Sequence, residues 1–254
     1  MKIANVQMQM HNSVEDNLKS MLRYIDEAAD IGVKLIAFPE LSVTGCHREI
    51  RRACDELRSS FNWVERISAT CRRNRIFAFV GAPTFSDEAI LDSYTLFDES
   101  GEIIGVSHKV GLTPSEQTFF AKGERRKVWN VCDLKIGIVI CREIADLPEL
   151  LEEMGAAVDL LLWPCFSGVY ETLPEGTDQV SLEQAQLVAG QFGARLIQAN
   201  WANSLNRPEL KEIGGSVYIS NRGKKLATAP LGEPGFGVIN TGEDSFDWYG
   251  RNDA

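Results

Sequence analysis

The stretch Leu134–Leu150, LKIGIVICREIADLPEL, decides the fold class and directs the search for a function. Its apolar run from Ile136 to Ile140 is typical of a buried strand, and the run stops at Cys141. Pro148 then marks the first turn of a helix. Loops that follow strands are where catalytic groups converge. The stretch therefore predicts a sheet-based α/β fold with a candidate nucleophile, although a single cysteine more often only packs in the core.

Two further segments share this arrangement. In VKLIAFPELSVTG, Glu40 follows the apolar run from Val33 to Phe38, and in IIGVSHKV, Lys109 follows another apolar strand. Taken singly, such a glutamate is typical of a helix cap or a solvated turn, and such a lysine is typical of the surface. Three chemically different groups that each end a buried strand are harder to explain in that way. We expect the carboxylate, the ammonium and the thiol to meet in one crevice at the strand ends.

The order of predicted elements is strand, helix, strand, helix, hairpin, twice over. The predicted strands cover residues 2–8, 33–38, 76–82, 93–97, 102–108, 127–131, 136–140, 158–163, 195–201, 217–220, 225–229 and 236–240. The predicted helices cover 13–32, 48–74, 148–155 and 181–192. Two sheets with helices outside them and one doubly wound sheet both fit this order. No repeat or linker divides the chain, so we expect a single domain over residues 1–254.

Composition narrows the classes of partner. The chain has 254 residues, 44% of them hydrophobic, and a net charge of −10, which argues against nucleic acid or an anionic membrane as a partner. It contains no run long enough to span a membrane and no signal-peptide pattern. Its six cysteines are scattered in the manner of a reducing compartment, so we expect a cytoplasmic protein. The three histidines are far apart and no metal or dinucleotide motif is present, so we expect no metal and no cofactor.

Three motifs now carry a specific resemblance. The chain contains FPEL-x-x-TG, then HKV-x-L followed by Glu116, Phe120 and Gly123, and then G-x-x-IC with PEL. In this order and over nearly the whole chain, they resemble the nitrilase superfamily of carbon–nitrogen hydrolases. The resemblance implies a four-layer αββα sandwich and a homodimer or higher homo-oligomer. It also implies a Glu-Lys-Cys triad of Glu40, Lys109 and Cys141, with Glu116 as the second glutamate found near the nucleophile in many members.

The chain departs from the family pattern in two places. Arg142 and Glu143 follow the nucleophile where many members have an aromatic residue and an acid, and Cys46 stands where a tyrosine or tryptophan is common. These changes bear on the substrate more than on the chemistry. Arg142 is a candidate substrate-positioning residue, since it could clamp a carboxylate, although it could equally pair with Glu143 or with the scaffold.

The chemistry of amide hydrolysis requires this combination of residues. A cysteine nucleophile divides one difficult hydrolysis into two easier steps. Glu40 is the candidate base, and Lys109, with a backbone N–H after Cys141, is the candidate stabiliser of the oxyanion. His108 is an alternative base, but neighbouring residues of a strand face opposite ways, so only one of His108 and Lys109 can face the thiol. The motif selects Lys109.

We therefore expect a hydrolase of a small-molecule amide or N-carbamoyl compound. The alternatives are a catalytically silent binding or scaffold protein of the same fold and an acyltransferase that uses the same thioester. For a homo-oligomer, Phe246, Trp248 and Tyr249 are exposed apolar candidates for the interface. The loop 173–176 is a candidate cap over the site.

Overall fold

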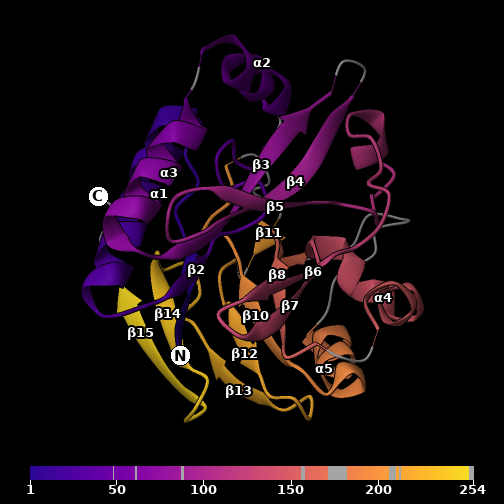
Figure 1. Cartoon of the computed structure of the whole chain (residues 1–254). Coiled ribbons are helices and arrows are strands. Elements are labelled where there is room, and N and C mark those ends of the chain that lie inside the picture. Colours follow the sequence, from indigo (N-terminus) through magenta and orange to yellow (C-terminus); the bar gives the residue numbers. More distant parts are fainter. Residues whose placement is uncertain are drawn as a thin grey trace.

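A computed structural model describes residues 1–47, 49–60, 62–86, 89–155, 158–170, 182–205, 210–211 and 213–251. Two mixed sheets form the centre of the molecule (Figure 1). The first has the strand order β15-β14-β1-β2-β3-β4-β5 and the second β13-β12-β10-β8-β7-β6, while β9 and β11 pair separately. The predicted loop 173–176 lies outside the described residues.

The bounds of the elements are as follows. The strands are β1 (Lys2–Gln7), β2 (Leu35–Ala37), β3 (Phe77–Phe85), β4 (Ile90–Phe97), β5 (Ile103–His108), β6 (Val128–Val131), β7 (Leu134–Ile138), β8 (Leu160–Pro164), β9 (Val169–Tyr170), β10 (Arg195–Ala199), β11 (Leu210–Lys211), β12 (Val217–Ile219), β13 (Lys225–Thr228), β14 (Gly235–Asn240) and β15 (Ser245–Gly250). The helices are α1 (Val14–Asp30), α2 (Ile50–Ser60), α3 (Trp63–Asn74), α4 (Leu147–Met154) and α5 (Leu182–Phe192), with short 3₁₀ helices η1 (Glu116–Thr118) and η2 (Cys141–Ala145).

Alternating side chains along the strands produce four layers. In β1, Ala4 and Val6 pack with α1 and α3 in one apolar cluster. Ile3 of the same strand faces the other way and packs with Ile136 and Ile197 of the second sheet. A third cluster joins the outer face of the second sheet to α4 and α5. The four-layer αββα sandwich is thereby confirmed, and Figure 1 shows α1 and α3 on one outer side and α4 and α5 on the other.

Helix α1 shows how local signals specify an element. The Ser13 side chain accepts a hydrogen bond from the Asp16 N–H and so caps the helix start, as predicted. Leu18, Met21 and Ile25 then lie on its buried face against the first sheet. None of the helices in the described part of the chain is long and apolar enough to cross a membrane.

The structure differs from the sequence predictions in three details. The helical region predicted over 48–74 is divided between two helices, α2 and α3, and Asn62, a residue type favoured before a helix start, precedes the second one. Lys109 does not end a fully buried strand, because β5 is an edge strand with Ile103 and Ile104 exposed. The prediction also omitted η2, which begins at Cys141 itself.

The C-terminal aromatic residues differ from expectation as well. Residues 245–250 form β15, which pairs with β14 along its whole length and makes one edge of the first sheet. Phe246 and Trp248 are partly buried, and Phe246 packs against the cluster between the sheets. Only Tyr249 of the three is exposed. Phe246 therefore stabilises the sandwich rather than offering a free apolar surface.

Candidate active site

Glu40 lies in the turn that follows β2, and both sheets hold this turn in place. The Tyr94 hydroxyl of β4 donates to the Phe38 carbonyl oxygen at 2.7 Å. The indole N–H of Trp201, two residues beyond the end of β10 in the second sheet, donates to the Glu40 carbonyl oxygen at 3.0 Å. The Glu40 side chain is 4% exposed. The backbone before and after the carboxylate is thus fixed, so the carboxylate is held in one place.

Lys109 is the charged centre of the site. Its side chain is fully buried, and Nζ donates to Glu40 Oε1 at 2.6 Å and to Glu116 Oε1 at 2.7 Å. His108 points the other way, where Nδ1 lies 2.8 Å from the hydroxyl of Ser93. The expected opposition of the two neighbouring side chains is therefore present, and Lys109 is the one that faces the glutamates.

Glu116 reaches the lysine because the loop folds back. It begins η1, and its second carboxylate oxygen, Oε2, accepts the Thr113 N–H at 2.8 Å. Its side chain is 24% exposed, compared with none for Lys109. One oxygen of Glu116 thus holds the ammonium while the other is held by the loop backbone.

Asp92 is a fourth charged residue at this centre, and the sequence interpretation missed it. It lies on β4, it is 2% exposed, and its Oδ2 lies 3.7 Å from Lys109 Nζ. Its backbone carbonyl also accepts the Lys109 N–H at 2.9 Å. A single aspartate in an ordinary hairpin strand gives no motif, so only the pairing of β4 with β5 reveals its neighbours.

Three carboxylates so close together have the spacing of a metal site. Oxygen atoms of Glu40, Asp92 and Glu116 all lie within 4.8 Å of one another. The Lys109 ammonium, however, bonds directly to two of the three. A cation supplied by the chain itself already occupies the space between them, so we interpret the cluster as a lysine site.

Cys141 begins η2 with a positive φ of 49°. Few residues other than glycine adopt this conformation, and such strain is often found at functional positions. The Trp163 indole N–H donates to the Cys141 carbonyl at 2.9 Å, and Sγ lies 4.0 Å from the Phe166 carbonyl oxygen. The turn that presents the thiol is therefore anchored to the end of β8.

The pKa values of Cys141 and Lys109 depend on the charges of their neighbours in the site. Burial, together with the negative charge of Glu40, raises the pKa of the Cys141 thiol, while Lys109 acts against this shift. Burial alone would lower the pKa of Lys109, but the charges of Glu40, Cys141, Glu116 and Asp92 outweigh it and raise the pKa. The lysine is thus held as an ammonium, and the thiol needs a base to lose its proton.

Glu143 has a structural place that the sequence did not reveal. It is 1% exposed, and its carboxylate accepts the N–H groups of Ile140 at 2.7 Å, Val110 at 2.6 Å and Gly111 at 3.0 Å. The Nε atom of Arg126 lies 3.5 Å from Oε1 of Glu143. Burial raises the pKa of Glu143 in spite of that arginine. One buried carboxyl group therefore ties the loop after Lys109 to the turn that carries Cys141.

Arg142 does not pair with Glu143. Its guanidinium donates to Asp146 at 2.6 Å, four residues further along the chain. Its side chain is 22% exposed and lines a cavity of about 600 Å³ together with Gln117, Leu112 and Phe120. Of the alternatives that the sequence left open for Arg142, the structure shows the pairing with the scaffold. The arginine also faces a cavity beside the loop that follows Lys109.

Cys46 lies next to the candidate base. Its thiol donates to the Glu40 carbonyl at 3.4 Å and lies 4.0 Å from Glu40 Oε2. Burial, and then the charge of Glu40, raise the pKa of this thiol well above its usual range. A neutral thiol therefore borders the carboxylate at the position where family members commonly carry a large aromatic residue.

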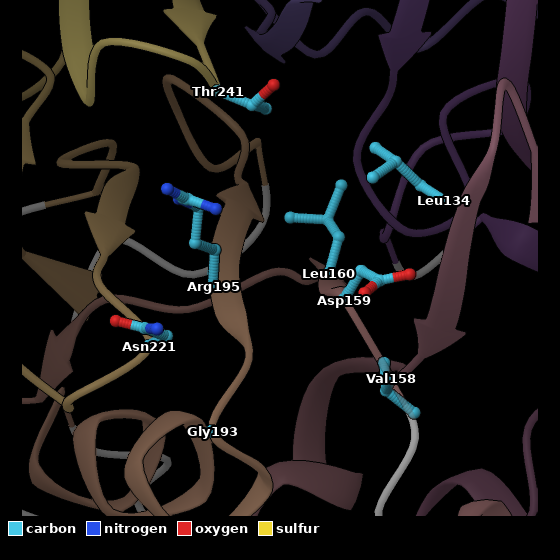
Figure 2. Close-up of a pocket in the computed structure, with 8 residues that line it drawn as sticks. All are labelled: Leu134, Val158, Asp159, Leu160, Gly193, Arg195, Asn221 and Thr241. Atoms are coloured by element: carbon cyan, nitrogen blue, oxygen red, sulfur yellow. The ribbon is translucent and has the colours of Figure 1, made fainter.

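A second hollow lies away from these residues. Its volume is about 250 Å³, and it is found at the amino-terminal ends of β8 and β10 (Figure 2). Arg195 at its wall pairs with Asp244 at 2.8 Å, and Asp159 accepts the Lys135 N–H at 2.8 Å. Arg195 and Asp159 are thus engaged in holding the scaffold, and the cluster around Lys109 remains the candidate active site.

Comparison with known proteins settles the family. The profile of the carbon–nitrogen hydrolases matches residues 2–241. The chain belongs to the carbon–nitrogen hydrolase family. The resemblance to the nitrilase superfamily inferred from the three motifs is confirmed.

This carbon–nitrogen hydrolase is similar to several curated proteins. It is 28% identical over 242 residues to nitrilase homolog 2 of Dictyostelium discoideum, covering 89% of this chain and 71% of that protein. It is 25% identical to the cyanide hydratase of Penicillium rubens, covering 82% of this chain and 66% of that protein. It is also 25% identical to the citrullinase of Francisella tularensis, covering 90% of this chain and 84% of that protein.

Solved structures show the same fold. The amidase from Nesterenkonia sp. matches the hydrolase with a TM-score of 0.78 at 24% identity, covering 94% of this chain and 89% of that chain. A glutamate-to-glutamine variant of the amidase from Nesterenkonia sp. AN1, which carries acrylamide added at its active-site cysteine, also matches with a TM-score of 0.78. That comparison has 23% identity and covers 94% of this chain and 92% of that chain.

Proposed function

We propose that this carbon–nitrogen hydrolase cleaves a small-molecule amide or N-carbamoyl compound through a thioester on Cys141. The observation that carries the proposal is the buried Lys109 ammonium, which bridges the carboxylates of Glu40 and Glu116 and interacts electrostatically with the Cys141 thiol. The similarity to an amidase whose cysteine adds to acrylamide supports it.

The first half of the reaction forms the thioester. Glu40 accepts the proton of the Cys141 thiol, and the thiolate attacks the carbonyl carbon. Lys109 and the N–H of Arg142 stabilise the oxyanion that forms. When the intermediate collapses, the C–N bond breaks and Glu40 returns the proton to the departing nitrogen, which leaves as ammonia or an amine.

The second half transfers the acyl group to water. Glu40 takes a proton from water, and the hydroxide attacks the thioester. The C–S bond breaks, and Glu40 returns the proton to the thiolate, which restores the resting site. Glu116 holds Lys109 through both halves. Arg142 contributes to substrate positioning from the wall of the neighbouring cavity.

A panel of small substrates tests this proposal. Primary amides, N-carbamoyl amino acids and small nitriles are incubated with the enzyme, with and without an amine acceptor, and ammonia and acyl products are measured. We expect ammonia from an amide or a carbamoyl compound, and none with Cys141→Ala. Conversion of nitriles alone would assign the enzyme to nitrile chemistry. Product formed only with the amine would indicate an acyltransferase, and no conversion would support a binding protein.

We also propose that the chain forms a homodimer or a higher homo-oligomer and acts in the cytoplasm. Members of the nitrilase superfamily usually form oligomers, and this supports the proposed oligomer. The scattered cysteines are typical of a reducing compartment, and this supports the cytoplasm.

A further inference from the structure

The centre of the candidate site holds more carboxyl groups than one ammonium can balance. Glu40, Asp92 and Glu116 surround Lys109, and two of the three carboxyl side chains are 4% exposed or less. Three carboxylates with one ammonium would leave two net negative charges beside the nucleophile. Charges so far removed from water are costly unless they are paired, so a proton should remain on one of the carboxyl groups.

Asp92 is the group best placed to keep that proton. Lys109 Nζ donates to Glu40 and Glu116 at 2.6 and 2.7 Å but lies 3.7 Å from Asp92, beyond hydrogen-bond length. Asp92 Oδ2 is buried and has no hydrogen-bond partner among the residues that the structure describes. An ionised oxygen left in this way would be strongly destabilising, whereas a protonated one can donate to a neighbouring carboxylate.

We propose that Asp92 is a positioning residue that carries a proton in the resting enzyme and shares it with the carboxylate of Glu40. Carboxylate oxygens of Asp92 and Glu40 lie within 4.8 Å of each other. Neighbouring buried carboxyl groups retain a proton between them, because both cannot ionise without strong repulsion. The proton leaves one net negative charge at the centre and keeps Glu40 ionised against Lys109. Ionised Glu40 can then accept the thiol proton. The role given to Glu40 rests on the proposed function.

The groups around Asp92 favour this assignment. Burial, and then the negative charge of Glu40, raise the pKa of Asp92 well above its usual range, although Lys109 opposes the shift. The titratable groups that interact with Asp92 are Glu40 and Cys46 from the segment after β2, Cys54 of α2, Lys109 at the end of β5 and Glu116 of η1. In the part of the chain that the structure describes, Lys109 is the one cation among these groups, and it already donates to two carboxylates.

Two substitutions separate a shared proton from simple packing. Asp92→Asn keeps the shape and an N–H donor but cannot ionise, and Asp92→Val keeps the bulk without any donor. Asp133→Asn is the matched control, because Asp133 is exposed and lies in the turn before β7, at the opposite end of that strand from Cys141. Each variant is compared with the wild type in three ways: the pH profile of kcat and KM, the pH dependence of Cys141 alkylation by iodoacetamide, and the infrared band of protonated carboxyl groups near neutral pH.

We expect Asp92→Asn to retain kcat within about threefold near neutral pH, since its amide replaces the donor. Its pH profile should lack an ionisation that the wild type shows on the basic side, and its difference spectrum against the wild type should show the loss of one protonated carboxyl band. Asp92→Val should lower kcat about 10- to 100-fold with a smaller change in KM, the scale of a lost supporting hydrogen bond. Asp133→Asn should match the wild type in all three measurements.

A pH profile and an infrared spectrum of Asp92→Asn that superimpose on those of the wild type would overturn the proposal. A large loss of kcat at every pH in folded Asp92→Asn would overturn it too, because the residue would then be needed in its ionised form. If Asp92→Val fails to fold, Asp92→Asn still decides the question. The infrared band does not depend on turnover, so it tests the shared proton even if the substrate panel shows no hydrolysis.

Discussion

At the scale of the residue, the geometry makes the three groups of the proposed triad interdependent. Lys109 is held by Glu40, and both interact electrostatically with the Cys141 thiol. A site of this kind loses most of its function when any one member is removed, and a second removal adds little.

We therefore expect Cys141→Ala, Glu40→Gln and Lys109→Ala each to lower kcat by at least about a thousandfold, with double variants little worse than single ones. Steady-state kinetics on the substrate found in the panel provides the measurement, and circular dichroism checks the fold. Iodoacetamide should inactivate the wild type, with the label located at Cys141 by mass spectrometry. Substantial turnover by folded Cys141→Ala would exclude the thioester mechanism.

Glu116 offers a finer test, because in the proposed mechanism it holds Lys109 without taking part in proton transfer. Glu116→Gln keeps the Thr113 contact available but removes the charge that faces Lys109. We expect kcat to fall about 10- to 1000-fold while Cys141 still reacts with acrylamide or iodoacetamide. Ser115→Ala, one position before Glu116, is the control for a local change, because Ser115 is exposed and its side chain makes no capping hydrogen bond to η1. Unchanged kinetics in both Glu116→Gln and Glu116→Ala would make Glu116 an ordinary loop residue.

At the scale of the element, the turn that carries Glu40 depends on a close approach between β3 and the segment after β2. A Cβ atom added at Gly81 would lie 2.5 Å from the Leu41 nitrogen and 2.5 Å from the Pro39 carbonyl oxygen. These are backbone atoms, so they cannot rotate away as a side chain could.

We expect Gly81→Ala to lower the free energy of unfolding by about 1–3 kcal/mol and to lower kcat, since the turn must shift. Gly190→Ala is the matched control. Gly190 is an exposed residue of α5, and the nearest atoms to an added Cβ are 3.8 Å away, so this change should stabilise the helix by about 0.5–1 kcal/mol. Denaturant unfolding gives both values. Equal effects of the two substitutions would mean that the approach at Gly81 is not tight.

Features that lie in contiguous patterns could be predicted from the sequence. Glu40, Lys109 and Cys141 each follow an apolar strand within a short motif, so both the strand and its terminal residue could be predicted. Asp92 and Glu143 could not, because their functions arise from partners far along the chain. Glu143 meets Val110, 33 residues earlier, and this contact leaves no pattern in either segment. Strand β15 was missed because its alternating aromatic residues are equally typical of an exposed tail.

At the scale of the whole molecule, pH should change stability through the buried carboxyl group. The pKa of Asp92 is raised on folding, so its contribution is fully present below the unfolded-chain pKa of about 3.9 and is lost as the pH rises through the folded-state pKa. We expect the Tm of the wild type to fall relative to that of Asp92→Asn as the pH rises from about 4 toward neutral. Thermal unfolding at a series of pH values measures this difference, and a constant difference in Tm would contradict the raised pKa.

The proposed oligomer is also tested at this scale. Light scattering at micromolar concentration should give a mass of at least twice the 28.2 kDa of one chain. A mass equal to that of one chain across the working concentration range would reject the oligomer.

The pairing of β1 has a consequence for how the chain folds during synthesis. β1 lies between β2 and β14, and Lys2 pairs with Asn240, so the first sheet needs residues from opposite ends of the described chain. The strands of the second sheet all fall within residues 128–228. On the ribosome, the second sheet can therefore assemble from a continuous stretch, while one edge of β1 waits unpaired for β14 to emerge. We expect that nascent chains released before residue 240 keep this edge open and aggregate, whatever the state of their catalytic residues.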